Sequence, residues 1–382
     1  MILGLQTDTF GAFGGIPTYN RLVCRVLDDP AFAERNTVLI ATDEPDVVRQ
    51  ENSAHPNLTL KGFGRQRVKF VKAALAAALR RDVDLVLAGH VNYAPLCLLL
   101  KLLHPGLRFG VFVYGWDVWF KPSWLRGFAL RRADFLISIS EYTKTQAIEV
   151  NRLDGKPIWV LPNAIDQNLE ESSDNARKLP VGTRILSVGR LESSEQQKGF
   201  DTVINCLPAL AEKVPSVQYF IIGSGTDVER HKALAATAGV SDRVHFLGTV
   251  DDATLQHCYQ SADIFAMPSA QEGFGFVYLE AMRYAKAVVA ARSGGAPEVV
   301  EDRVTGRLVE YGNEAELTQA LIELCLDAEK RRELGLAGYQ RLQEKFTFPQ
   351  FKASLIEIIS HELPPKVRSE KRFPVGQSTQ TP

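Results

Sequence analysis

The sequence contains few cysteines and no pattern that would pair them. Its five cysteines are scattered through 382 residues, and none belongs to a C-x-x-C pair. Disulfide frameworks place an even number of cysteines at short spacings, and metal-binding cysteines usually come in close pairs. The sequence therefore favours a protein with free, buried thiols in a reducing compartment, which we expect to be the cytoplasm.

Long apolar runs are also missing. The longest, Ala94–Leu100, ends at Lys101 and is too short to cross a bilayer. The N-terminus has no basic segment followed by an apolar stretch and a cleavage site, as a signal peptide would have. We therefore expect a soluble chain that could touch a membrane only from its surface.

A strong charge of one sign is absent as well. The net charge is −1, which excludes a strongly basic nucleic-acid binder. The charge is nevertheless uneven, because residues 1–160 carry 20 Lys and Arg against 15 Asp and Glu, and the remainder carries 24 against 30. One D-x-D pattern, Asp82-Val83-Asp84, precedes a predicted strand and so lies at the wrong end of a sheet for a metal site. We expect no metal.

What is present indicates a large α/β protein. The length and the 45% apolar content allow two domains with ordinary globular cores. One stretch is especially informative: the apolar run 263–267 predicts a buried strand, and helical spacing begins at about Gly275. At such a strand-to-helix turn, the amides of Gly273, Phe274 and Gly275 are expected to be unpaired and to face an anion.

Two acids frame this turn. Glu272 and Glu280 are eight residues apart, which is about 12 Å if the whole interval is helical. That span suits a ligand with a hydroxyl-rich group at each end and a diphosphate between them, with Glu280 on a ribose and Glu272 on a sugar. The alternative is one acid that favours the helix dipole and one solvated acid.

The segment E-G-F-G-x4-E, followed by Ala281-Met282, closely resembles the E-x7-E signature of retaining glycosyltransferases of family 4. The resemblance extends over about residues 1–362. It implies the GT-B fold, in which two Rossmann-like domains face a cleft and the C-terminal helix crosses back to the N-domain. It also implies that Arg190 and Lys198, in G-R-L…K-G-x-D, hold the diphosphate of a nucleotide-sugar, although the interval between them is longer than usual.

Further motifs resemble the family at positions that follow predicted strands. The pair Gly14-Gly15 matches a loop at the cleft, and Gly223-x-Gly225 matches a loop near the nucleotide. Tyr114 replaces the His of a common His-Gly pair, so a catalytic role for that His does not carry over. The resemblance implies a catalytic set of Glu272, Arg190 and Lys198, and a substrate-binding set of Gly14, Gly15, Tyr114, Asp117, Gly223, Gly225, Gly273, Phe274, Gly275 and Glu280.

The domain boundary is expected where the sequence becomes polar and irregular. Residues 1–166 would form the N-terminal acceptor-binding domain, and residues 167–345 would form the C-terminal nucleotide-sugar-binding domain. Residues 346–362 would be the crossover helix. The Pro-, Lys- and Ser-rich segment 363–382 has the composition of a disordered tail.

A basic segment in the N-terminal half predicts a membrane contact. Residues 61–81 contain seven Lys and Arg and no acid, with Val68, Val71, Leu75 and Leu79 on one predicted helical face. Such a helix can rest on anionic headgroups at the cytoplasmic face of the plasma membrane. The alternative is a surface helix that packs Val68 and Leu75 inward. The rings of Trp116, Trp119, Phe120 and Trp124 could line an acceptor site or support the membrane contact.

We therefore expect a retaining hexosyltransferase. It would move a hexose from a GDP-mannose or UDP-glucose type donor to an alcohol, which we expect to be a lipid-linked or polysaccharide sugar in cell-envelope or exopolysaccharide synthesis. The resemblance implies no cofactor and no metal. Two alternatives stay open: a nucleotide-sugar 2-epimerase of the same fold, and a catalytically silent sugar-nucleotide-binding subunit.

Overall fold

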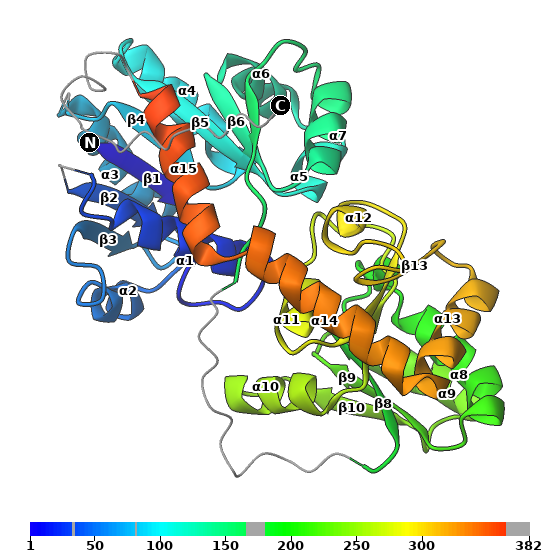
Figure 1. Cartoon of the computed structure of the whole chain (residues 1–382). Coiled ribbons are helices and arrows are strands. Elements are labelled where there is room, and N and C mark those ends of the chain that lie inside the picture. Colours follow the sequence, from blue (N-terminus) through cyan, green and yellow to red (C-terminus); the bar gives the residue numbers. More distant parts are fainter. Residues whose placement is uncertain (33–34, 81, 166–179, 364–382) are drawn as a thin grey trace. The chain divides into compact units, whose positions relative to one another are not determined.

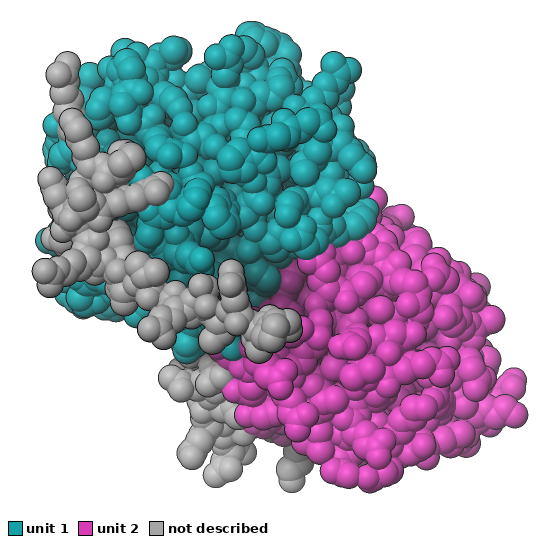
Figure 2. All heavy atoms as spheres, turned by 45° about the horizontal axis from the view of Figure 1, so that its top comes forward, with its two compact units in different colours: residues 1–164, 348–382 teal, residues 165–347 magenta. Residues whose placement is uncertain are grey.

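The computed structural model describes residues 1–32, 35–80, 82–165 and 180–363 (Figure 1). The chain forms two compact units, which Figure 2 distinguishes by colour. Unit 1 combines residues 1–164 with residues 348–382, and unit 2 contains residues 165–347. Each unit is built on one parallel sheet with helices between the strands. The predicted Rossmann-like α/β fold with two domains is confirmed.

The sheet of unit 1 has seven parallel strands in the order β3-β2-β1-β4-β5-β6-β7. The strands are β1 (Ile2–Gln6), β2 (Asn36–Ile40), β3 (Leu58–Gly62), β4 (Leu85–Ala88), β5 (Arg108–Val113), β6 (Phe135–Ser138) and β7 (Ile158–Val160). Every residue of β1, β4 and β6 is buried. Strands covered on both faces read as continuous apolar runs, which is why these were predictable.

The helices of unit 1 are α1 (Gly15–Leu27), α2 (Pro45–Glu51), α3 (Arg67–Leu79), α4 (Ala94–Leu103), α5 (Trp116–Trp119), α6 (Trp124–Arg132), α7 (Glu141–Asn151) and α15 (Phe348–Glu362). Inward-facing residues of α3, α4, α6 and α7 join the central strands in one core. Helix α7 begins as predicted at Ser140, whose side chain accepts a hydrogen bond of 3.0 Å from the Thr143 amide.

The last helix, α15, belongs to unit 1 (Figure 1). The Arg25 guanidinium lies 3.7 Å from the centroid of the Phe348 ring. The buried Glu362 pairs with Arg108 and accepts a hydrogen bond of 2.9 Å from the indole of Trp159. The predicted return of the C-terminal helix to the N-terminal domain is therefore confirmed.

Unit 2 has six parallel strands in the order β10-β9-β8-β11-β12-β13. They are β8 (Thr183–Val188), β9 (Val217–Ile222), β10 (Val244–Gly248), β11 (Ile264–Met267), β12 (Ala287–Ala291) and β13 (Gly306–Val309). Its helices are α8 (Phe200–Lys213), α9 (Val228–Thr237), α10 (Asp252–Ser261), α11 (Phe276–Arg283), α12 (Ala296–Val299), α13 (Glu314–Leu326) and α14 (Ala328–Lys345).

Both sheets change direction next to their first strand. The chain moves outward from β1 to β2 and β3, and then returns to place β4 on the other side of β1. In the same way, β8 lies between β9 and β11. In doubly wound sheets a ligand binds outside the carboxyl ends of the strands at this switch point. The loops after β1, β4, β8 and β11 are therefore the places to search for a site.

The structure corrects two details of the basic segment 61–81. Lys61 and Gly62 end strand β3, which we had not predicted, and α3 begins only at Arg67. The helix buries Phe70, Ala74 and Ala78, whereas Val68 is 69% exposed. Phe70 and the alanines therefore face the core, and Val68 is not packed inward as the surface-helix alternative expected. Of the seven cations, Arg81 lies outside the described residues.

The expected domain boundaries and tail remain predictions. Residues 166–179, around the expected boundary between the two domains, lie outside the described residues, and so does the expected tail beyond Leu363. All five cysteines are described, and all are buried and form no disulfide. Within the described ranges, no helix is long and apolar enough to cross a membrane.

Candidate active site

The site in unit 2 begins with the loop after β8. Glycines at the end of β9 are needed there, because a Cβ on Gly223 would lie 1.9 Å from the Gly189 carbonyl oxygen. A Cβ on Gly225 would lie 2.2 Å from the carbonyl oxygen of Leu191. The Leu191 amide also donates a hydrogen bond of 3.0 Å to Ser224. The predicted G-x-G loop thus fixes the backbone on both sides of Arg190, whose side chain is 71% exposed.

Lys198 is brought to the same edge by close packing of two loops. Gly199 follows it with φ of +86°, and a Cβ there would lie 2.5 Å from the Pro268 carbonyl oxygen. The Ala270 amide donates a hydrogen bond of 2.9 Å to Gln197. The residues just after β11 therefore lie against the residues just before α8, which places Lys198 near the acid that precedes α11.

Glu272 is partly buried in the loop between β11 and α11. Its carbonyl oxygen accepts a hydrogen bond of 2.7 Å from the amide of Gly295, so the loop after β12 supports it from behind. Burial raises the pKa of Glu272, and the nearby positive charge of Lys198 opposes this shift. The carboxylate thus lies in a partly dry place beside one cation, where it can accept hydrogen bonds from hydroxyl groups.

The turn before α11 provides two free amides instead of the three expected. Among the described residues, neither Gly273 nor Gly275 has a partner for its amide. The Phe274 amide instead bonds to the carboxylate of Glu272, and its ring is buried against Phe346. Gly275 caps the helix with φ of +100°, as the predicted helix start requires. Helix α11 adds its dipole to the two free amides.

Glu280 lies on the first turns of α11 and is already held by a tyrosine. The Tyr259 hydroxyl of α10 donates a hydrogen bond of 2.6 Å to Oε2 of Glu280. Burial raises the pKa of Glu280, and this hydrogen bond opposes the shift. Because the helix begins at Phe276, the estimate of 12 Å between Glu272 and Glu280 was wrong in assuming eight helical residues.

A third acid, Glu195, lies between the two cations. Its carboxylate pairs with Arg190 and, at 2.9 Å, with Lys198. Its negative charge also contributes to the raised pKa of Glu272. We had not predicted a role for Glu195, because in the sequence it is one of several polar residues in an interval that looked only unusually long.

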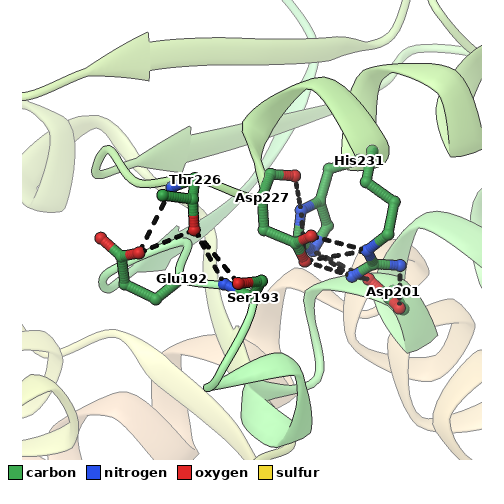
Figure 3. Close-up of polar contacts among 7 residues, drawn as sticks. Glu192, Ser193, Asp201, Thr226, Asp227 and His231 are labelled. Carbon is green, nitrogen blue, oxygen red and sulfur yellow. Dashed lines mark hydrogen bonds and ion pairs between the residues drawn. The ribbon is translucent and has the colours of Figure 1, made fainter.

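Polar contacts hold the surroundings of these cations (Figure 3). Thr226 accepts a hydrogen bond of 3.2 Å from the Ser193 amide and donates one of 2.8 Å to Glu192. A second group links the start of α8 to α9: Asp201 contacts Arg230 at 2.7 Å and His231 at 2.8 Å. Although burial opposes it, these two partners lower the pKa of Asp201 to about 2. Asp201 therefore stabilises the framework behind the site.

Unit 1 contains a separate pocket near the ends of β4 and β5. Its volume is about 390 Å³, and its lining residues are His90, Val91, Asn92, Trp116, Asp117, Phe120, Lys121, Pro122 and Arg126. The side chains of Trp116 and Phe120 are about half exposed, and their ring centroids lie 5.4 Å apart. Two rings, two cations and a buried acid give this pocket groups that can contact both the faces and the polar edges of a sugar.

The segment that carries Tyr114 forms one wall of this pocket. Asp117 Oδ1 accepts hydrogen bonds of 3.0 Å and 2.8 Å from the amides of Tyr114 and Gly115. Its other oxygen and the Tyr114 hydroxyl are buried without a hydrogen-bond partner among the described residues. Burial raises the pKa of Asp117 and lowers the pKa of His90, while the opposite charge of each group opposes the shift of the other.

His90 is the imidazole that we did not predict. The sequence places Tyr114 where the family often has His, but the ring of His90 lies 6.5 Å from the Tyr114 ring in a stacked arrangement. The signal in the sequence was the position of Gly89-His90, directly after a predicted strand. An imidazole therefore lies in this pocket although the His-Gly pair is missing.

The predicted Gly14-Gly15 loop follows β1 at the same carboxyl edge. Gly14 caps α1 with φ of +135°, and the nearest atom to a Cβ there would be 3.9 Å away, on Pro17. Packing therefore leaves open space in front of this glycine, and the constraint is its backbone conformation. No cluster of His, Cys, Asp and Glu suited to a metal occurs among the described residues.

Two Rossmann-like units, one with cations, free amides and carboxylates at its switch point, are the arrangement of GT-B proteins. The family models agree with this class. Glycosyltransferase Family 4 matches residues 13–169, and Glycosyl transferases group 1 matches residues 170–341. The chain belongs to the group 1 glycosyltransferases of GT-B fold.

Similar proteins support this assignment. A GDP-mannose-dependent alpha-(1-6)-phosphatidylinositol monomannoside mannosyltransferase of Mycolicibacterium smegmatis is 31% identical over 61% of this chain and 64% of its own length. A D-inositol 3-phosphate glycosyltransferase of Corynebacterium jeikeium is 30% identical over 64% of this chain and 61% of its own length. The matches thus span less than two thirds of both relatives. The Anabaena protein HepE, solved with UDP, shares the fold with a TM-score of 0.74 and 20% identity, over 94% of this chain and 100% of HepE.

Proposed function

We propose that this chain transfers a hexose from a nucleotide-diphosphate sugar to an alcohol, with retention of configuration. The observation that carries the proposal is the edge of the unit 2 sheet. There Arg190 and Lys198 lie with the free amides of Gly273 and Gly275. Cations and helix N-terminal amides together bind diphosphates. Glu280 would accept hydrogen bonds from the ribose, and Glu272 would accept them from the sugar.

The proposed reaction needs no covalent intermediate on the protein. The bond between the sugar C1 and the diphosphate oxygen breaks, and the acceptor oxygen bonds to C1 on the same face. The acceptor proton passes to the leaving phosphate. Negative charge that develops on the diphosphate would be stabilised by Arg190, Lys198 and the two amides. We propose that these groups suffice without a metal or other cofactor.

The relatives favour GDP-mannose or a UDP-sugar as the donor. The Mycolicibacterium relative is named as GDP-mannose-dependent, and the Corynebacterium relative is named as a D-inositol 3-phosphate glycosyltransferase. HepE was solved with UDP. We propose a lipid-linked or saccharide acceptor of cell-envelope or exopolysaccharide synthesis. The pocket of unit 1 would hold it, with Trp116 and Phe120 against a sugar face and His90 near its hydroxyl groups.

Thermal-shift measurements with GDP, UDP and their mannose and glucose conjugates test donor binding. Mass spectrometry of the products with added acceptors then tests transfer. Stabilisation by a nucleotide-sugar together with a glycosylated product supports the proposal. Binding without transfer or hydrolysis would indicate the silent binding subunit. Conversion of the donor sugar to its 2-epimer without an acceptor would indicate the epimerase.

We further propose that unit 1 rests on the cytoplasmic face of the plasma membrane through α3, α4 and α6. These three helices contain several Lys and Arg and no Asp or Glu. Their exposed large apolar side chains are Val68, Leu79, Leu99, Leu102, Leu103, Trp124, Leu125 and Phe128. Apolar side chains among cations without acids favour an anionic bilayer surface. This surface would extend the predicted basic segment 61–81 onto α4 and α6.

Co-sedimentation with liposomes tests the membrane proposal. Binding should require anionic lipid and weaken with salt. Replacing Arg65, Arg67, Lys69 and Lys72 by Gln should reduce it sharply, and so should Arg131→Gln with Arg132→Gln and Trp124→Ser. A control variant with Lys213→Gln and Lys232→Gln in unit 2 keeps the binding. A wild type that ignores anionic liposomes at low salt would refute the membrane contact and leave the donor site untouched.

A further inference from the structure

The carboxylate of Glu195 contacts the two cations that we assign to the donor diphosphate. It contacts both Arg190 and Lys198, which are the only two side-chain cations that we assign to the donor among the described residues. Only 20% of the Glu195 side chain is exposed, and the same fraction of Lys198. A single carboxylate therefore contacts both cations, of which Lys198 is largely covered and Arg190 is exposed.

The backbone keeps Glu195 in this position. The turn starts at Glu192, whose carbonyl oxygen accepts a hydrogen bond of 2.8 Å from the Glu195 amide. It ends at Lys198, whose amide donates a hydrogen bond of 3.3 Å to the Glu195 carbonyl oxygen. Contacts of Thr226 with Glu192 and Ser193 anchor the start of the turn to the loop after β9 (Figure 3). The side chain of Glu195 can therefore move while its backbone stays in place.

We propose that Glu195 is an internal counter-ion that occupies the diphosphate position until the donor displaces it. The inference rests on the proposed role of Arg190 and Lys198 in donor binding. Before binding, the carboxylate holds the two cations near each other across the long interval that separates them in sequence. After transfer, it competes with the nucleoside diphosphate and favours its release. Because Glu272 adds a second negative charge nearby, Glu195 has to turn away when the donor binds.

A purely structural role for Glu195 makes the opposite prediction. If the ion pairs only shaped the loop, their loss would leave the affinity for the diphosphate unchanged or weaken it. If Glu195 competes with the ligand, removing its charge strengthens binding. The sign of the change therefore separates the two roles, and Gln keeps the size and shape of the side chain.

Isothermal titration calorimetry with GDP and with UDP, at low salt, measures this sign. In Glu195→Gln, the nucleotide that the wild type binds should bind about three- to fivefold more tightly, the range of a partly exposed ion pair. The gain should shrink as salt screens the charges. The matched control is Glu212→Gln, which removes an exposed negative charge on α8 that does not contact the two cations, and it should leave the affinity unchanged.

A double-mutant cycle with Arg190→Gln locates the effect. When Arg190 is already replaced by Gln, Glu195→Gln should improve the binding free energy of the nucleotide by less than half as much as it does in the wild type. The reason is that one of the two competing ion pairs is already gone. If a folded Glu195→Gln variant binds the nucleotide equally well or more weakly than the wild type, the inference about Glu195 is wrong. The proposed function still stands in that case, because the wild type binds the nucleotide. A wild type that binds neither GDP nor UDP would overturn both.

Discussion

The two units have the same plan but present different chemistry at equivalent places. In each, a central first strand creates a switch point where the chain reverses direction. In unit 2 the loops there carry Arg190, Lys198 and free amides among carboxylates. In unit 1 they carry Gly14, His90, Asp117 and exposed rings. The fold provides the edge of the sheet, and the loops determine whether that edge suits a diphosphate or the hydroxyl groups of a sugar.

The outer surfaces differ as well. Exposed large apolar side chains in unit 1 gather on α3, α4 and α6, which have no acids. In unit 2 exposed ones such as Val304 and Tyr311 lie in loops and Leu326 ends α13, and acids stand close to each of them in the sequence. A cluster needs a partner more than isolated side chains do. The comparison therefore assigns the donor to unit 2 and the acceptor and the membrane to unit 1, as proposals that substitutions can test.

The largest expected effect tests the cations of unit 2. Replacing Lys198 or Arg190 by Ala should lower kcat roughly 10²- to 10³-fold, since each stabilises charge that develops on the diphosphate. Donor affinity should change much less. Steady-state kinetics at saturating acceptor measures both, with Lys213→Ala, an exposed lysine on α8, as the control. An effect confined to KM would contradict the assigned role.

The next test concerns the ribose position of unit 2. Glu280→Ala should weaken donor binding by roughly 1–3 kcal/mol, the loss of a charged hydrogen-bond partner. The KM for the acceptor should stay the same, because unit 1 is unchanged. Calorimetry of the donor and kinetics of the acceptor measure the two, and Glu301→Ala is a control at an exposed acid of the same unit. Unchanged donor affinity in the folded variant would refute the role.

A smaller effect is expected from the pocket of unit 1. His90→Asn should raise the KM for the acceptor about fivefold, the loss of one polar contact, and leave donor affinity unchanged. His257→Asn in unit 2 is the control. An effect on donor affinity alone would break the division between the units.

The same substitution has a pH signature. Because burial lowers the pKa of His90, the unfolded chain binds a proton below about pH 6.5 before the folded protein does. The unfolding free energy of the wild type should therefore decrease as the pH falls through about 6.5. In His90→Asn the unfolding free energy should depend less on pH over this range. Urea unfolding between pH 7 and pH 5 measures it.

The smallest expected effect is on the framework of unit 2. Asp201→Asn should cost about 0.5–1 kcal/mol of unfolding free energy at pH 7, because Asp201 is partly exposed. Its folded pKa of about 2 is below the unfolded value, so its contribution is complete above about pH 4 and is lost as the pH falls toward 2. Urea unfolding of both proteins at pH 7 and pH 2.5 should show the difference disappearing in acid.

Most of the fold could be predicted because its central strands are buried on both faces. Runs such as Arg108–Val113 and Ile264–Met267 are continuous and end in glycine or proline turns. Strand β3 could not be predicted, because Leu58–Gly62 is a partly exposed edge strand that runs directly into a basic segment. The core face of α3 was missed because alanine gives no strong apolar signal although it packs closely.

The site was predictable where a residue type has one main use. The glycines at 223, 225 and 275 stand where a side chain would collide or where φ is positive, and their motifs indicated as much. The roles of His90 and Tyr259 depend on residues from other segments of the chain, and the role of Glu195 depends on how its own irregular turn folds. No spacing within one segment reports that Tyr259 reaches Glu280, or that the Phe274 amide turns back to Glu272.

The return of α15 to unit 1 affects how the protein is made. The Ile165 amide donates a hydrogen bond of 3.0 Å to Phe346, so the two ends of unit 2 lie side by side. Unit 2 is thus inserted into unit 1. At typical translation rates, unit 1 waits roughly ten to forty seconds for α15 after its first 164 residues have been made. During that wait, the partners of α15, including Tyr19, Arg25 and Trp159, remain uncovered on the ribosome.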